Sequence, residues 1–264
     1  MPTSIDTIIF LGFLIANIIL GLASSQGIKS LKEYAVGNRD FSTATIAATI
    51  VATWIGGSFF FTLSSEAYSN GLHFIWVVLL GDFSCLLLVG LFFTPRMAEF
   101  LGKLSIAEAM GDLYGEKVRI VTAIAGFIGT CGIIAMQLRV AGLVFEYVLE
   151  LPGIYGILSA GIIVTLYSSL GGIKSVTFTD VIQFFTFGTV IPAIAYFLLS
   201  SLDSVFTITE VLSNNPLFDY KQVFDFSKKQ PLYHLFLFFC FAIPAFNPAI
   251  FQRIAMAKTT TQAG

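Results

Sequence analysis

Seven long apolar runs constrain this chain more than any other feature of its sequence. Each run is near or above the roughly 20 residues that an α-helix needs to cross a bilayer. Only 11% of the residues are charged, against roughly 25% in soluble domains, so the chain lacks the charge to cover a water-facing surface. Continuous runs also exclude an outer-membrane barrel, whose strands alternate apolar and polar residues. We therefore predict an all-α, polytopic membrane protein. The runs lie at about Thr7–Ala23, Ser42–Ser65, His73–Pro95, Ile120–Val148, Ile154–Leu170, Phe178–Leu199 and His234–Ile254.

Several function classes are disfavoured by what the sequence lacks. The net charge of −2, without a basic patch, argues against a nucleic-acid partner. The motifs of serine hydrolases, zinc proteases and P-loop enzymes do not occur, so we expect no enzyme activity and no organic cofactor. Cys85, Cys131 and Cys240 all lie in apolar runs without a CxxC spacing, which argues against a zinc site and a disulfide framework. No Lys or Arg precedes the first run, so we expect a retained helix and not a cleaved signal peptide.

The basic residues predict the orientation of the chain. With the N-terminus outside, ten of the 14 basic residues fall on the inner side, and the positive-inside rule favours this arrangement. We therefore expect one multi-pass transmembrane domain, residues 1–264, in the cell inner (plasma) membrane, with an external loop at 201–233. The inner residues would be Lys29, Lys32, Arg39, Arg96, Lys103, Lys117, Arg119, Lys174, Arg253 and Lys258.

Two of the runs contain helix-breaking residues. The second has Gly56 and Gly57 near its middle, and the seventh has Pro244 and Pro248. Unwound backbone at membrane depth survives only where it is buried in protein or lines a polar cavity. A pair of interrupted helices at similar depth is typical of the substrate and ion site of secondary transporters. The alternative is that each break is a packing notch or a kink, since both residue types are common in membrane helices.

Asp180 is a carboxylate at the predicted cytoplasmic start of the sixth run. Such a group is costly unless it meets water, a cation or a partner, which favours a cation path that opens to the inside. Alternatively, Asp180 caps the helix by accepting its first amide hydrogens. Asp82 and Arg139 are two further charges within runs, at matched predicted depth. They suggest an ion pair between neighbouring helices, although each could instead be hydrated separately.

Three stretches of the sequence resemble the sodium:solute symporter family, which includes the sodium-coupled proline, pantothenate and sugar carriers. The first runs from Ser58 to Leu72, and the second joins Leu166–Ile173 to the Thr-Asp-x-x-Gln motif at Thr179–Gln183. The third, Phe246–Lys258, resembles the inner end of the family's seventh helix. The resemblance implies the first half of a LeuT-type inverted-repeat fold: a peripheral helix, a complete five-helix repeat, and the first helix of the second repeat.

The same resemblance implies the site residues. Sodium, the coupling ion, would bind the main-chain carbonyls of Ala52 and Ile55, and Asp180 would lie on its path. Phe59 and Cys240 replace polar ligands of the sugar carriers, which favours another small organic solute, such as an amino or carboxylic acid. The positions expected to line the solute site are Gly56, Gly57, Ser58, Phe59, Cys240 and Asn247.

The family's remaining sodium ligands come from a helix that would follow residue 264. We therefore expect an N-terminal part of a symporter, either a fragment or one half whose C-terminal half is supplied by another chain, and no measurable sodium binding by residues 1–264 alone. Besides sodium and the solute, the expected partner is the lipid bilayer. The alternatives are the sensory input module of a symporter–kinase type protein, or a non-functional remnant. The coding sequence downstream of codon 264 would distinguish these functions.

Overall fold

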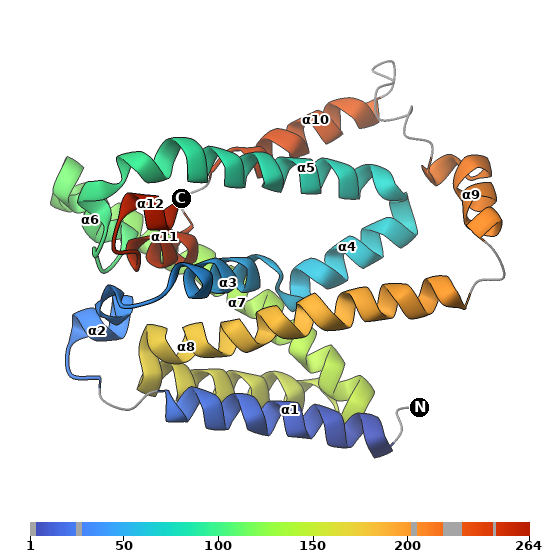
Figure 1. The fold of residues 1–264 in the computed structure, drawn as a ribbon, viewed down its shortest axis with the longest axis horizontal. Helices are drawn as coiled ribbons and strands as arrows, with labels where there is room; N and C mark the ends of the chain where they lie inside the picture. Colours follow the sequence, from blue (N-terminus) through green and yellow to red (C-terminus); the bar gives the residue numbers. More distant parts are fainter. Residues whose placement is uncertain (1–3, 25–27, 202–204, 219–228, 245–246) are drawn as a thin grey trace. The chain divides into compact units, whose positions relative to one another are not determined.

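A computed structural model describes residues 4–24, 28–201, 205–218, 229–244 and 247–264. Every regular element within these residues is a helix (Figure 1). The chain divides into two compact units. The first unit contains residues 1–58, 96–184 and 246–263, and the second contains residues 59–95, 185–245 and 264.

The first unit contains the amino-terminal helices, the middle of the chain and the carboxyl-terminal helices. Helices α4 and α8 begin in this unit and end in the other. The bounds are α1 Ser4–Ala23, α2 Leu31–Val36, η1 Gly37–Arg39, α3 Thr43–Trp54, α4 Gly57–Asn70, η4 Ala98–Phe100, α6 Ile106–Tyr114, α7 Glu116–Leu149, α8 Gly153–Ser200, α11 Pro248–Ala255 and α12 Thr260–Ala263.

The second unit is built on the close packing of α5 against α10. At Gly81 of α5, an added Cβ would lie 2.7 Å from the Cβ of Phe241 on α10. Small residues of this kind let membrane helices approach one another closely. The bounds are α5 Leu72–Leu88, the π-helical turn η2 Val89–Phe93, η3 Thr94–Arg96, α9 Val205–Asn214, η5 Pro216–Phe218 and α10 Lys229–Ala242.

Each of the seven predicted runs corresponds to helix over most of its described length. The seventh run is interrupted between α10, which ends at Ala242, and α11, which begins at Pro248, and residues 245–246 of this predicted break lie outside the described residues. Four helices within the described residues are long and apolar enough to cross a membrane, and the bent pair α3 and α4 makes a fifth candidate span. The fifth and seventh runs correspond to the shorter apolar helices Gly153–Leu166 and Pro231–Ala242. The external segment predicted at 201–233 contains α9 and η5, and α10 begins within it at Lys229. The all-α membrane fold is therefore confirmed.

The connection between the fifth and sixth runs is shorter than the predicted run bounds of Leu170 and Phe178 imply. The chain stays helical through residues 153–200 and is interrupted by a kink at Gly172, where φ is 51° and ψ is −147°. The sixth run therefore does not start at Phe178, because helical backbone resumes directly after the kink.

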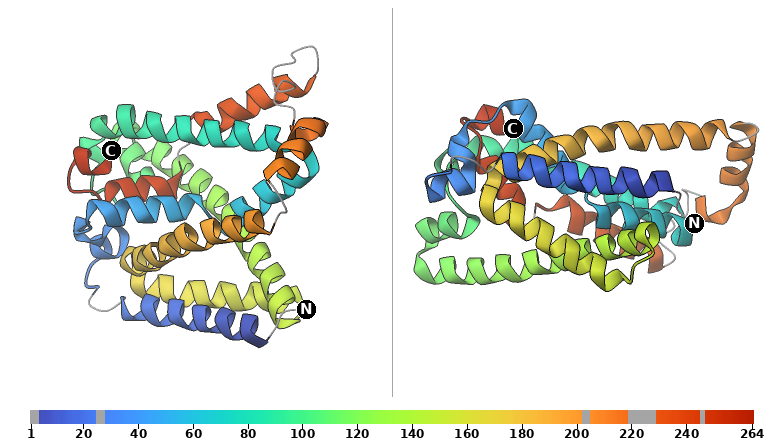
Figure 2. Two further views of the ribbon diagram at one scale, coloured as in Figure 1. Left: turned by 45° about the vertical axis from the view of Figure 1, so that its right-hand side comes forward. Right: turned by 90° about the horizontal axis from the view of Figure 1, so that it is seen from below.

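The amino-terminal part of α1 meets the carboxyl-terminal end of α7 (Figures 1 and 2). The rings of Phe10 and Phe145 meet edge to face with their centroids 5.2 Å apart. The Thr7 hydroxyl donates a hydrogen bond of 3.4 Å to the carbonyl of Val148. These contacts attach the predicted peripheral helix to the first unit.

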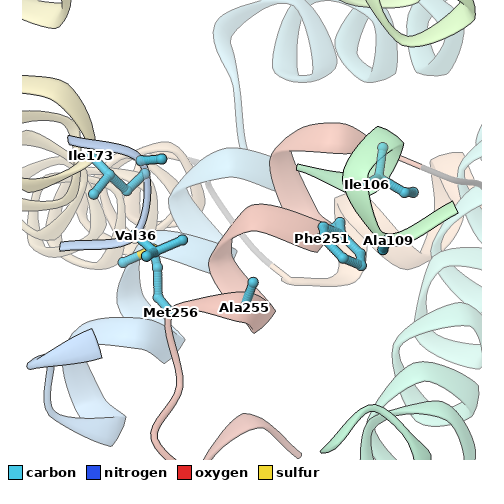
Figure 3. Packing of buried hydrophobic residues seen from close by; sticks show 8 residues of the cluster. Val36, Ile106, Ala109, Ile173, Phe251, Ala255 and Met256 are labelled. Atoms are coloured by element: carbon cyan, nitrogen blue, oxygen red, sulfur yellow. The ribbon is translucent and has the colours of Figure 1, made fainter. Parts of the chain in front are cut away.

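A buried hydrophobic cluster joins α2, α6, α8 and α11 (Figure 3). Val36, Ala109, Ala255 and Met256 are fully buried at its centre. Because its members come from segments far apart in the sequence, the cluster fixes the short helix α2 on the end of α11. The cluster consists of Ala35, Val36, Ile106, Ala109, Ile173, Phe251, Ala255 and Met256.

Candidate ion and solute site

The second span breaks at Ile55 and Gly56. Ile55 has φ −85° and ψ 65°, and the Gly56 amide donates a hydrogen bond of 3.0 Å to the carbonyl of Trp54. In a continuous helix that amide would donate to the carbonyl of Ala52. The Ala52 carbonyl therefore loses its usual helical donor. The break lies slightly earlier than predicted, since Gly57 and Ser58 already belong to α4.

Gln137 of α7 supports this break. Its side-chain oxygen accepts a hydrogen bond of 3.3 Å from the amide of Ser58, one of the first amides of α4 that lack a helical partner. Its amide nitrogen lies where a side chain at Gly56 would begin. The sequence analysis did not single out Gln137. An uncharged amide within an apolar run was the available signal, because polar groups in membrane helices tend to face protein or cavities.

Replacing Gly56 with alanine should displace Gln137 and remove its hydrogen bond to the Ser58 amide, because the new methyl group would overlap the side-chain amide. Loss of that hydrogen bond costs roughly 0.5–1.5 kcal/mol, measurable by unfolding of the detergent-purified protein. Gly129→Ala is the control, since no atom lies within 4 Å of the Cβ position at that site of α7. Equal stability of the two variants would contradict the contact.

A buried polar network joins α3, α8 and α11. The Thr49 hydroxyl donates a hydrogen bond to Oδ2 of Asp180, and Nη2 of Arg253 donates to the same oxygen at 2.9 Å. Nε of Arg253 donates to the Thr49 hydroxyl at 3.1 Å, which closes the ring. Asp180 and Arg253 are 8% and 7% exposed, and Thr49 is fully buried. Each charge therefore has its counter-charge, as a buried ion pair requires.

Two expectations about these residues are wrong. Asp180 is not a helix cap, because it lies eight residues beyond Gly172 and inside α8. Arg253 is not an inner-loop cation. It belongs to α11, where it is buried against Asp180 and also donates to the Ala249 carbonyl at 3.2 Å.

The network lies close to the break along α3. Thr49 precedes Ala52 by three residues, roughly 4.5 Å along the helix axis, and both residues are buried. Residues three apart share one face of a helix. The Asp180 carboxylate therefore contacts α3 about one turn before the carbonyl that the break releases.

The predicted solute residues have different local roles. The Asn247 side-chain oxygen caps α11 by accepting hydrogen bonds from the amides of Ala249 and Ile250, at 2.9 and 3.4 Å. Phe59 and Cys240 belong to the second unit, and Cys240 is exposed. A solute role for these residues stays a prediction, as does the suggested pair of Asp82 with Arg139.

The comparison with known sequences decides the family. Residues 34–263 match the Sodium:solute symporter family. The chain belongs to this family. The resemblance carried by the Gly-Gly and Thr-Asp-x-x-Gln stretch and by the end of the seventh run is thereby confirmed.

Relatives of this symporter-family chain include carriers of different solutes. It is 27% identical to the high affinity choline transporter 1 of Homo sapiens over 57% of this chain and 26% of the relative. It is 29% identical to the Homo sapiens sodium/iodide cotransporter over 62% of this chain and 25% of the relative. It is 27% identical to the Vibrio parahaemolyticus sodium/glucose cotransporter over 60% of this chain and 29% of the relative. The matches thus span little more than a quarter of each relative. All three are named as transporters, in keeping with the prediction of a non-enzyme.

Proposed function

We propose that this chain forms part of a sodium-coupled symporter for a small organic solute, such as an amino or carboxylic acid. Sodium binds the carbonyl oxygens of Ala52 and Ile55 at the break between α3 and α4. One observation carries the proposal. The Gly56 amide donates its hydrogen bond to the Trp54 carbonyl, which leaves the Ala52 carbonyl without its helical donor. The solute binds beside the break, against Gly56, Gly57, Ser58 and Asn247 of the first unit.

In the proposed orientation, the protein lies in the inner (plasma) membrane of the cell. Its N-terminus is outside and its C-terminus is in the cytoplasm. The start of α3 is then its cytoplasmic end, and Thr49 lies closer to the cytoplasm than Ala52. Asp180, bonded to Thr49, is therefore a relay on the inner sodium route and not a ligand in the same shell as the two carbonyls.

The Asp180–Arg253 pair closes that route in the present conformation. A sodium ion that reaches the carboxylate competes with the guanidinium for the same oxygen, which Arg253 contacts at 2.9 Å. Binding of the ion would weaken the links of α8 to α3 and α11. Passage of sodium is thereby coupled to a separation of the three helices at their inner ends.

Uptake into membrane vesicles that contain the complete gene product tests the proposed function. Radiolabelled amino and carboxylic acids are offered with an inward sodium gradient or an equal potassium gradient. We expect accumulation of at least one solute only with sodium. Uptake that does not depend on sodium but follows a proton gradient would overturn the proposed sodium coupling.

An Asp180→Asn variant should lower the apparent sodium affinity or the turnover about tenfold, equivalent to about 1.4 kcal/mol. The amide oxygen can still accept from Thr49 and Arg253, but it offers sodium no charge. Because the variant also leaves the buried Arg253 guanidinium without its counter-charge, uptake is compared at equal amounts of folded protein in the vesicles. Asp112→Asn is the control, because Asp112 is an exposed carboxylate that pairs with Lys103 at the surface. Unchanged sodium dependence of uptake in Asp180→Asn would show that Asp180 has only a structural role.

A further inference from the structure

An open cavity of about 410 Å³ lies in the first unit, beside η1 and Lys258, which follows the end of α11 by three residues. Its lining consists of Lys32, Asn38, Arg39 and Lys258. Three of these four side chains are cationic, and no carboxylate lines the cavity. The segment that carries the first three connects α1 to α3, so the cavity lies where two membrane-associated helices meet the aqueous boundary.

Neighbouring carboxylates neutralise only part of this charge. Asp40 pairs with Lys258 at 2.7 Å, and that contact holds the pKa of the Asp40 carboxyl below its usual range. Glu33 is engaged elsewhere, by Lys174 at 2.5 Å. Among the described residues, Lys32 has neither a hydrogen-bond partner nor an ion-pair partner. The cavity thus keeps a net positive charge and one unengaged ammonium group.

The wall of the cavity is held in place by hydrogen bonds. Nε and Nη2 of Arg39 donate to the carbonyls of Ala257 and Lys258, at 2.7 and 2.5 Å. The Gln262 side chain donates to the Phe41 carbonyl at 2.8 Å. The left-handed backbone of Asn38 and Arg39, with φ 57° and 61°, is thereby fixed directly after Ala35 and Val36, which belong to the buried cluster. A site held in this way does not need to be ordered when a ligand arrives.

We infer that this cavity binds the phosphate group of an anion, with the Lys32 ammonium as its principal contact and Arg39 and Lys258 as the surrounding charge. A phosphate group presents several acceptor oxygens, which match the ammonium and guanidinium donors. Two sources carry this group: the headgroup of an anionic phospholipid in the adjoining leaflet, and free phosphate. Basic pockets at the ends of membrane helices commonly take lipid headgroups.

Native mass spectrometry of the detergent-purified chain tests the site. The probes are short-chain phosphatidylglycerol, short-chain phosphatidylcholine and inorganic phosphate. We expect one phosphatidylglycerol per chain at concentrations where phosphatidylcholine is not retained. Retention of phosphatidylglycerol but not inorganic phosphate identifies the lipid as the source, and retention of both identifies a general phosphate site.

A Lys32→Gln variant should bind the retained anion about fivefold more weakly, the effect expected for one basic residue near a charged surface. The variant breaks no contact among the described residues, so it should fold normally. Lys117→Gln, which removes one charge from the exposed start of α7, is the matched control and should bind like the parent. Equal weakening by both variants, or retention of none of the anionic probes, would overturn the assignment.

Discussion

An Arg253→Met variant is expected to lose about 3–5 kcal/mol of unfolding free energy, because the change leaves Asp180 as an uncompensated buried charge. The methionine retains much of the packing volume, so the loss reports on the charge. Only the Thr49 hydroxyl would remain bonded to the carboxylate oxygen that Arg253 contacts. Unfolding of the purified protein by sodium dodecyl sulfate, followed by circular dichroism, measures the change.

Two further variants distinguish the loss of the Asp180–Arg253 ion pair from the general effect of removing an arginine. Asp180→Asn combined with Arg253→Met removes both charges and should recover most of the lost stability. Arg119→Met breaks an exposed contact of 3.8 Å with Glu116, and such surface pairs contribute about 0–1 kcal/mol. A double variant as unstable as Arg253→Met alone would contradict the proposed role of the pair.

Replacing Gly172 with alanine should have an effect of similar size. The backbone there, with φ 51° and ψ −147°, lies in a region that costs other residues about 1–3 kcal/mol. The new Cβ would also lie 2.6 Å from the carbonyl oxygen of Tyr34 on α2, an overpacking that costs a further 1–3 kcal/mol or so. We expect α2 to separate from the kink, breaking the 3.0 Å hydrogen bond from the Tyr34 hydroxyl to Ser168.

Unfolding and limited proteolysis together measure this effect. Cleavage between residues 28 and 42 should become faster in Gly172→Ala than in the parent. Gly188→Ala in the same helix is the control, because its Cβ position is open and alanine is the better helix former by about 1 kcal/mol. Unchanged cleavage in Gly172→Ala would mean that the kink does not hold α2.

The membrane helices were predictable because hydropathy is a local property of the sequence. The described part of each apolar run is mostly helical, and the break in the second run was placed within one or two residues from Gly56 and Gly57. The end of a helix is harder to predict. The predicted runs leave seven residues between Leu170 and Phe178, whereas a single residue with unusual backbone angles, Gly172, suffices to bend α8.

The partners of Asp180 were not predictable, because they depend on contacts between distant segments. Thr49 lies 131 residues before Asp180, and Arg253 lies 73 residues after it. The orientation rule treats Arg253 as a cation near the end of a run, and it has no means of distinguishing a solvated side chain from a buried one. Gln137 was missed for the same reason, since only the fold brings it to the Ser58 amide.

The 73-residue separation of Asp180 from Arg253 has a consequence for biosynthesis. Ribosomes add about 5–20 residues per second, so the arginine is made roughly 4–15 s after the aspartate. During that interval, Thr49 is the only partner of Asp180 in the network that has already been synthesised. The nascent chain therefore carries a carboxylate without its cation while its neighbouring helices enter the membrane. Water must hydrate that carboxylate until α11 is made, which makes this interval the time at which membrane quality control can most readily recognise the chain.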